Sequence, residues 1–237
     1  YVWQAGGKWF EGTDTGWKVE LTSQKSVDVA SYWQGLLDAN LVTPVKTFTD
    51  EWNKAVNTGQ IWGWVSAVWG YATIETNAPD TAGKWPVAAM PQWTAGAPSG
   101  GNWGGSTTAV FKGSKHPAEA AKFAVWLNTN TEALTMLNQK GGLYPATTAG
   151  QDLPALQQPS DFFGGQDIFA VFKQASAQVD PSWTWGPVMN ETYNTLTDGF
   201  GAALNGQGTL GDALGTAQSK TLDAMDAQAI PIVGGGS

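Results

Sequence analysis

Tryptophan is the residue type in this sequence whose chemistry says most about the chain. The 237 residues include 14 tryptophans, several of them in loops rich in Gly, Asn, Gln, Ser and Thr, where a packed core has little use for them. Indole is a flat apolar surface with one N–H donor. The C–H face of a neutral polyol stacks on it, while amides and short hydroxyl side chains bond the hydroxyls. The loop tryptophans therefore favour an uncharged, sugar-like ligand, and they are Trp93, Trp103, Trp183 and Trp185.

Hydrogen-bonding groups surround one of these tryptophans. The segment 94–106 is almost entirely Ala, Gly, Pro, Ser and Asn around Trp103, and its glycines allow the backbone to approach a bound molecule closely. Asn102 adds an amide, and Gly104 and Gly105 add uncovered backbone donors. The complete set of candidate ligand-binding residues is Trp185, Trp103, Trp69, Trp183, Asn102, Gly104, Gly105 and Tyr144.

The loop 178–187 carries two of these candidates. Trp183 and Trp185 are two positions apart, and we expect only one of them to meet a ligand easily. Each is either a stacking platform or part of the core that covers the following helix. A sugar ring laid on one indole would remove ~80 Å² of apolar surface from water, worth about 2 kcal/mol, so losing that platform would weaken binding more than tenfold.

Charge and the remaining reactive residues argue against other classes of function. The net charge is -8, the 12 lysines are scattered and arginine is absent, so we expect no nucleic-acid partner. The single histidine, His116, precedes Pro117 and is best placed to cap a helix. Cysteine is absent, the acidic residues do not cluster, and residues 96–105 lack the Lys-Ser/Thr of a phosphate loop. We therefore expect no catalytic residue, no metal and no cofactor.

A glycoside hydrolase is the enzymatic alternative. Such an enzyme needs two carboxyl groups at a fixed separation across the sugar. Asp161, Asp167, Asp180 and Glu191 are available, although nothing in the sequence pairs them. A carbohydrate-binding surface protein is the other alternative, and such modules are normally all-β, in contrast to the helical patterns near the carboxyl end.

Helix signals are clearest near the two ends of the chain. Apolar residues recur at helical spacing over 24–39 after a candidate N-cap at Ser23, and residues 50–57 form a second short helix. A third helix begins at Pro117. Two later apolar stripes consist of Met189, Tyr193, Leu196, Phe200 and Ala203, and then, after a Thr209-to-Asp212 capping pattern, of Leu210, Leu214, Ala217 and Met225.

Strand signals lie between the helices. Residues 8–19 indicate a loop or hairpin, and three apolar runs of strand length cover residues 61–66, 85–90 and 107–111. Strands separated by helices favour an α/β chain. Four tryptophans in expected strands and helices should lie in the core, and they are Trp33, Trp62, Trp64 and Trp126.

Four segments carry motifs that occur in a recognisable order. They read Trp-Gln-Ala-Gly-Gly at 3–7, Asn-Thr-Gly-Gln-Ile-Trp from 57, Trp-Pro-Val-Ala-Ala-Met-Pro at 85–91, and Gly-Gly-Ser-Thr-Thr-Ala-Val-Phe-Lys-Gly-Ser-Lys-His-Pro-Ala-Glu-Ala-Ala at 104–121. In this order they resemble the carboxyl-terminal portion of the sugar-binding solute-binding proteins of bacterial ABC importers, the group that includes maltose-binding protein. The resemblance spans nearly the whole chain. It departs from the family pattern where Ile61-Trp62 replaces Ala-Met and in the order of Trp69 and Gly70.

The resemblance implies an α/β, two-lobed fold of the type II periplasmic binding protein kind, with one lobe mostly absent from this chain. Residues 1–103 and 142–233 would build the carboxyl lobe, and residues 104–141 would be a strand–helix segment of the amino lobe. Residues 234–237 would be a flexible tail or linker. We expect the native protein to be longer, because a strand at 107–111 needs neighbours for its backbone groups.

The resemblance also implies a function. The protein would bind a sugar or oligosaccharide in a cleft between two lobes and deliver it to the permease of an ABC importer. Its partners would be the carbohydrate, the permease and the missing amino-terminal lobe. It would work at the extracellular face of a bacterial membrane, held there by a lipid anchor, or in the periplasm.

Overall fold

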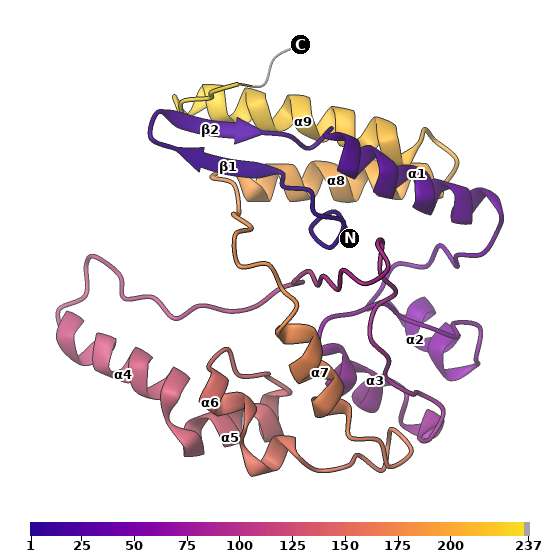
Figure 1. The fold of residues 1–237 in the computed structure, drawn as a ribbon, viewed down its shortest axis with the longest axis vertical. Helices are drawn as coiled ribbons and strands as arrows, with labels where there is room; N and C mark the ends of the chain where they lie inside the picture. Colours follow the sequence, from indigo (N-terminus) through magenta and orange to yellow (C-terminus); the bar gives the residue numbers. More distant parts are fainter. Residues whose placement is uncertain (235–237) are drawn as a thin grey trace. The chain divides into compact units, whose positions relative to one another are not determined.

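The computed structural model describes residues 1–234, which form two compact units (Figure 1). Unit 1 contains Tyr1–Pro44, Gln92–Gly101 and, among the described residues, 178–234. Unit 2 contains Val45–Pro91 and Asn102–Ala177. Each unit has its own apolar clusters, so each is described separately.

Unit 1 combines a short hairpin with three helices. Strands β1 (Phe10–Thr13) and β2 (Gly16–Val19) are antiparallel, with Phe10 opposite Val19. Helices α1 (Gln24–Asp38), α8 (Met189–Leu204) and α9 (Leu210–Ala227) pack together, with α9 lying against both α1 and α8. The predicted hairpin and the predicted helices of this unit are therefore confirmed.

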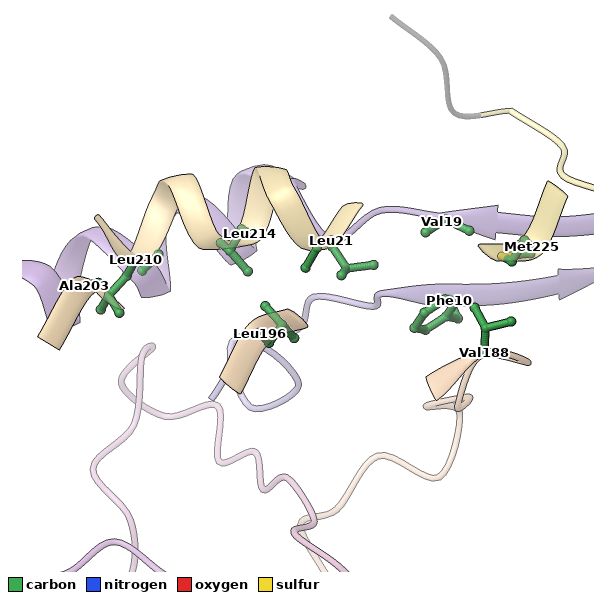
Figure 2. Packing of buried hydrophobic residues seen from close by; sticks show 11 residues of the cluster. Phe10, Val19, Leu21, Val188, Leu196, Ala203, Leu210, Leu214 and Met225 are labelled. Carbon is green, nitrogen blue, oxygen red and sulfur yellow. The ribbon is translucent and has the colours of Figure 1, made fainter. Parts of the chain in front are cut away.

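The core of unit 1 lies where the hairpin meets these helices (Figure 2). Leu210, Leu214 and Ala217 follow one another at spacings of four and three, so they share one face of α9 and are buried there. On α8 the matching buried residues are Leu196 and Ala203. The hairpin and the end of α9 complete this core with Phe10, Val19, Leu21 and Met225.

A capping box closes the start of α9, and backbone hydrogen bonds fix the chain that follows the helix. Thr209 and Asp212 form the predicted capping box, in which the Thr209 hydroxyl accepts from the Asp212 N–H at 3.1 Å and Asp212 accepts from the Thr209 N–H at 2.9 Å. After the helix, the chain returns beside β2, where the Trp17 N–H donates to the Pro231 carbonyl at 2.9 Å. A second backbone hydrogen bond at this edge runs from the Val233 N–H to the Trp17 carbonyl at 2.9 Å.

Unit 2 is built from short helices joined by long loops. Its helices are α2 (Asp50–Asn57), α3 (Gly70–Asn77), α4 (Pro117–Thr129), α5 (Thr131–Gly141), α6 (Thr148–Gln151) and α7 (Ile168–Ser176), with the 3-10 turns η1 (Pro79–Thr81) and η2 (Pro154–Leu156). One apolar cluster centres on Trp52, Val56 and Ile74. A second centres on Leu134, Leu153 and Leu156. The predicted helices at 50–57 and from Pro117 are confirmed.

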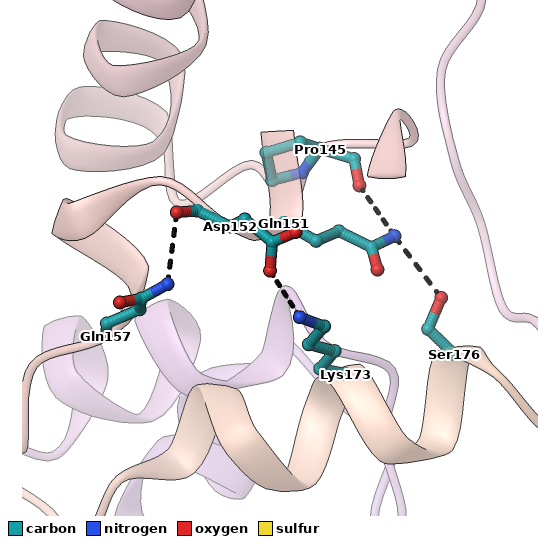
Figure 3. A network of polar contacts seen from close by, with 6 residues as sticks. All are labelled: Pro145, Gln151, Asp152, Gln157, Lys173 and Ser176. Carbon is teal, nitrogen blue, oxygen red and sulfur yellow. Dashed lines mark hydrogen bonds and ion pairs between the residues drawn. The ribbon is translucent and has the colours of Figure 1, made fainter. Parts of the chain in front are cut away.

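A polar network joins the loop around α6 to α7 (Figure 3). The Gln151 amide donates to the Pro145 carbonyl at 3.3 Å and to the Ser176 hydroxyl at 3.4 Å. Lys173 on α7 forms an ion pair with Asp152. These contacts hold the loop against the helix and support the second apolar cluster of unit 2.

The three apolar runs predicted as strands are not strands. Within residues 1–234 the named strands are β1 and β2, and residues 61–66, 85–90 and 107–111 run as irregular chain. The physical reason is that a strand exists only with a partner for its N–H and C=O groups, and local apolar sequence does not supply one. Residues 107–111 are all exposed.

Two tryptophans that were expected in the core are exposed. Trp62 is 91% exposed. Residues 61–66 do not form a strand, so no strand face directs its side chain into a core. Trp126 on α4 is 47% exposed, and α4 has no buried residue at all. Trp64 and Trp33 are partly buried against apolar clusters. Of the predicted tail, residues 235–237 lie outside the described residues.

Candidate functional site

The first aromatic cluster lies in unit 1, and we call Trp3, Trp9, Trp183 and Trp185 the Trp185 cluster. Trp3 and Trp183 stack with ring centroids 4.8 Å apart and an interplanar angle of 11°. Trp185 stands on edge to both, at 84° to Trp3 and 75° to Trp183. Trp9 leans on Trp183 at 5.9 Å. Edge-to-face and offset-stacked pairs are the favoured arrangements of aromatic rings.

The members of the Trp185 cluster differ in what remains open to a ligand. The Trp3 indole N–H donates to the Asp180 carbonyl at 3.1 Å, and the Trp9 N–H donates to the Ser26 hydroxyl at 3.0 Å. Trp183 is covered by Trp3 and Trp9, and its buried N–H has no hydrogen-bond partner. Trp185 is 51% exposed. Trp185 is therefore the ring available for stacking, and Trp183 supports it.

The loop that carries Trp183 and Trp185 also carries a carboxylate. Asp180 accepts a hydrogen bond from the Ser182 N–H at 2.8 Å, and the hydrogen bonds from Ser182 lower the pKa of its carboxyl group. The side chain is exposed. It therefore remains ionised and offers oxygen acceptors on the same loop as Trp185.

The second aromatic cluster lies in unit 2, and we call Phe48, Trp52, Trp64, Trp69 and Trp103 the Trp103 cluster. Trp64 is its hub, with centroid distances of 5.0 Å to Trp52, 6.1 Å to Phe48, 6.0 Å to Trp69 and 6.4 Å to Trp103. Trp52 is fully buried and Trp103 is 39% exposed. The cluster therefore has a buried base and an exposed rim.

Hydrogen bonds and a glycine fix the rim of the Trp103 cluster. The Trp69 indole N–H donates to the Trp103 carbonyl at 3.0 Å, and the two rings lie 5.0 Å apart. Gly104 has φ +80°, and a Cβ there would lie 3.3 Å from the Trp69 indole nitrogen. The Asn102 amide donates to the Gly104 carbonyl at 3.3 Å. A side chain at position 104 would therefore strain the turn and crowd Trp69.

The structure divides the predicted site residues into three groups. Trp183 and Trp185 belong to the Trp185 cluster, while Trp69, Trp103, Asn102, Gly104 and Gly105 lie together in unit 2. Tyr144 packs elsewhere in unit 2, beside the cluster of Leu134, Leu153 and Leu156. Its hydroxyl is buried without a partner, and burial, with a smaller contribution from the Asp152 charge, raises its pKa to about 12. Whether these residues bind a ligand stays a prediction.

The sequence gives little sign of the supporting rings. Trp3, Trp9 and Trp64 lie near turns and apolar runs, and these positions do not reveal which rings contact them. Phe48 was not singled out at all. Its only local signal is its place just before the helix cap Thr49, and that does not reveal a ring at the rim of a tryptophan cluster.

Other polar features of the described residues suggest neither a metal site nor a membrane span. A hollow of about 290 Å³ in unit 2 is lined by Tyr71, Glu75, Asn138 and Lys140 among others. Burial raises the pKa of Glu75, against a hydrogen bond from Ser160 at 3.4 Å that lowers it. Within residues 1–234 no group of three His, Cys, Asp or Glu could hold a metal ion, and no helix there is both long and apolar enough to cross a bilayer.

Solved structures define the class of protein to which this fold belongs. The chain matches the galacto-N-biose-/lacto-N-biose I-binding protein of the ABC transporter from Bifidobacterium longum, in complex with lacto-N-biose, with a TM-score of 0.83 and 30% identity over 97% of this chain and 55% of that one. The ABC transporter associated binding protein from B. animalis subsp. lactis, in complex with β-1,6-galactobiose, gives a TM-score of 0.82 and 24% identity over 98% of this chain and 60% of that one. The predicted fold class is confirmed: the chain holds part of the α/β, type II fold of solute-binding proteins.

Sequence comparison gives the family. The family model of the bacterial extracellular solute-binding proteins matches residues 1–164, and the chain belongs to this family. It is also similar to the lactose-binding protein of Rhizobium radiobacter, with 29% identity over 209 residues, 86% of this chain and 48% of that protein. The arabinooligosaccharide-binding protein of Bacillus subtilis (strain 168) is 22% identical over 220 residues, 90% of this chain and 48% of that protein. The chain thus spans about half the length of these curated relatives.

Proposed function

We propose that this chain is the ligand-contacting part of a solute-binding protein that captures an uncharged di- or oligosaccharide for an ABC importer. The observation that carries the proposal is the pair of aromatic clusters, each a packed base of indoles with an exposed tryptophan at its edge. Trp185 and Trp103 are the two exposed platforms. The names of the two curated relatives and the sugars in the two solved structures support this class of ligand.

Each platform has polar groups at hand for sugar hydroxyls. Beside Trp103 lie the Asn102 amide and the backbone of Gly104 and Gly105. The loop that carries Trp185 also carries the ionised Asp180 carboxylate. One sugar ring on one indole contributes about 2 kcal/mol through its apolar face, and the polar groups add orientation more than affinity.

The second wall of the binding site would come from protein outside this chain. The relatives are about twice as long as the matched region, and we assign residues 1–103 and 142–233 to a carboxyl lobe and 104–141 to an amino lobe. The exposed apolar side chains of 104–141 support this assignment, because they are the ones that a further lobe would cover. They are Val110, Phe111, Phe123, Val125, Trp126 and Met136.

The family supports the place of action. Its members are bacterial extracellular proteins, and we propose that the complete protein is held at the outer face of the membrane by a lipid anchor, or is free in the periplasm, and delivers its sugar to the importer's permease.

Binding is favoured over hydrolysis by the surroundings of the carboxylates. A glycosidase needs a general acid with a raised pKa opposite a second carboxylate. Asp180, on the loop of Trp185, has a lowered pKa and is suited to accepting hydrogen bonds. Glu75 has a raised pKa, but the described lining of its hollow holds no second carboxylate.

Titration with sugars separates these alternatives. The complete protein is mixed with lactose, lacto-N-biose, β-1,6-galactobiose and arabinooligosaccharides, tryptophan fluorescence is followed, and the mixtures are then analysed for hydrolysis products. The proposal predicts a saturable fluorescence change with at least one sugar and no products. Release of monosaccharides, or no saturable change with any of these sugars, would contradict it.

A further inference from the structure

Phe48 has a backbone conformation that a large side chain rarely adopts. Its φ is +66°, in the left-handed region, where a bulky residue is an outlier. The turn around it is fixed, because the Thr49 hydroxyl donates to the Lys46 carbonyl at 2.8 Å and accepts from the Trp52 N–H at 3.3 Å as the cap of α2. Glycine or asparagine would adopt this conformation at lower cost.

Burial does not account for a phenylalanine at this position. The side chain is 54% exposed, so half of its apolar surface faces solvent. A strained residue that a core would not require is a candidate for a functional role. The question is what the exposed face of this ring contacts when the protein works.

The neighbours of Phe48 suggest an answer. Its ring lies 5.9 Å from Trp69 and 6.1 Å from Trp64, which are also the rings that Trp103 contacts. Phe48 and Trp103 are therefore two exposed aromatic rings on one shared base. The base is anchored by Trp52, which is 1% exposed and lies 5.9 Å from Phe48.

We infer that Phe48 is a ligand-contacting residue that stacks on a second sugar ring of the ligand while Trp103 takes the first. The inference rests on the proposed function and deepens it: the Trp103 cluster selects a ligand of at least two sugar units over a monosaccharide. The strained turn keeps the Phe48 ring at the rim before the ligand arrives, so that no loop has to be ordered on binding.

Two substitutions at Phe48 and one control test this role in the complete protein. Phe48→Leu keeps an apolar side chain but removes the flat ring, and Phe48→Tyr keeps the ring. Tyr193→Leu on α8 of unit 1 is the matched control, because Tyr193 is an aromatic residue with a similar exposure of 58%. Affinities are measured for lactose, lacto-N-biose and β-1,6-galactobiose, with galactose and glucose as monosaccharide probes, and thermal unfolding checks that each variant is folded.

The inference predicts that Phe48→Leu weakens disaccharide binding about tenfold and changes monosaccharide binding by less than about twofold, whereas Phe48→Tyr and Tyr193→Leu leave both nearly unchanged. Unchanged disaccharide affinity in Phe48→Leu would overturn the inference and leave the proposed function standing. An equal loss for disaccharide and monosaccharide would overturn it too, because it would indicate a general effect on the cluster. A wild-type protein that binds none of the sugars would instead refute the proposed function.

Discussion

Two tryptophans that are neighbours in the sequence have different roles in unit 1. Trp183 lies face to face with Trp3 and is covered on its other side by Trp9, whereas Trp185 stands on edge to the stack and is half exposed. The difference comes from the neighbours of Trp183, because Trp3 and Trp9 cover that ring and leave Trp185 half exposed. At the scale of single residues, then, support and contact are divided between two positions of one loop.

This division predicts unequal losses in the free energy of unfolding for the two substitutions. Trp183→Ala should lower the free energy of unfolding by about 2 kcal/mol or more, because it removes a ring from the middle of the stack. Trp185→Ala should change it by less than about 1 kcal/mol, because the exposed ring loses fewer contacts. Urea denaturation of both variants measures the difference. Equal destabilisation by the two substitutions would show that the rings share the supporting role.

The left-handed turn at Phe48 predicts that glycine at this position gives a more stable protein than alanine. At most positions a protein with alanine is more stable than one with glycine. At φ +66° the Cβ of alanine clashes with the backbone, and glycine, which has no Cβ, avoids this clash. Phe48→Gly should therefore be more stable than Phe48→Ala by about 1 kcal/mol. Thermal or urea unfolding of the two variants measures this difference. If Phe48→Ala is the more stable variant, residue 48 does not keep its left-handed conformation in solution.

At the scale of elements, helix faces and the cap of α9 were well predicted from the sequence, whereas Ser23 and His116 stand at the N-cap positions of α1 and α4 without a side-chain cap hydrogen bond. Thr209 and Asp212 cap α9 as expected, since a capping box depends on residues only three apart. Leu196 and Leu214 lie on the faces that their spacing predicts. Tyr193 is on the predicted stripe of α8 but is exposed, because the stripe is wider than the face that the core covers.

Strands and clusters could not be predicted in the same way. A strand at 107–111 depends on a partner elsewhere in the molecule, and the apolar run alone does not reveal whether that partner exists. The tryptophan clusters depend on contacts between distant segments, such as Trp3 with Trp183 and Trp69 with Trp103. Composition indicated the chemistry of these rings, while their pairing needed the three-dimensional structure.

The hollow between α3 and α5 predicts a pH effect on stability. Burial raises the pKa of Glu75 above its ordinary value of 4.5, so the folded state binds this proton more tightly than the unfolded state. The associated stability is complete below pH 4.5 and is lost as the pH rises through the raised pKa. Glu75→Gln stays neutral and still accepts from Ser160. The free energy of unfolding of Glu75→Gln, relative to that of wild type, should therefore increase from acidic to neutral pH.

Unfolding free energies of wild type and Glu75→Gln across this pH range measure the effect. Glu51→Gln is the control, because it removes an exposed carboxylate from the same unit. A constant difference between wild type and Glu75→Gln at all pH values would show that the Glu75 carboxyl is as well solvated in the folded protein as in the unfolded chain.

At the scale of the whole molecule, charge and apolar surface are unevenly distributed. Among the described residues unit 1 has 11 acidic side chains and 4 lysines, while unit 2 has 9 and 8. The net charge of the chain therefore belongs mainly to unit 1, which disfavours an anionic ligand there. Unit 2 instead exposes the apolar side chains of α4, a helix without a buried residue.

This exposed surface predicts a difference between the chain and the complete protein. If residues 104–141 belong to an amino lobe, the amides of α4 should exchange with deuterium at least tenfold more slowly in the complete protein than in residues 1–237 alone. The capped helix α9, whose face is already buried in unit 1, serves as the internal control. Equal exchange of α4 in both samples would contradict the assignment of this segment.

Calorimetric titration of the complete protein with an uncharged disaccharide tests the central claim most directly. The two platform variants Trp185→Ala and Trp103→Ala are compared with Trp62→Ala, which removes a tryptophan that is 91% exposed and belongs to neither cluster. We predict that each platform variant weakens binding about tenfold or more, and that Trp62→Ala binds like wild type. Undiminished binding in both platform variants would contradict the account.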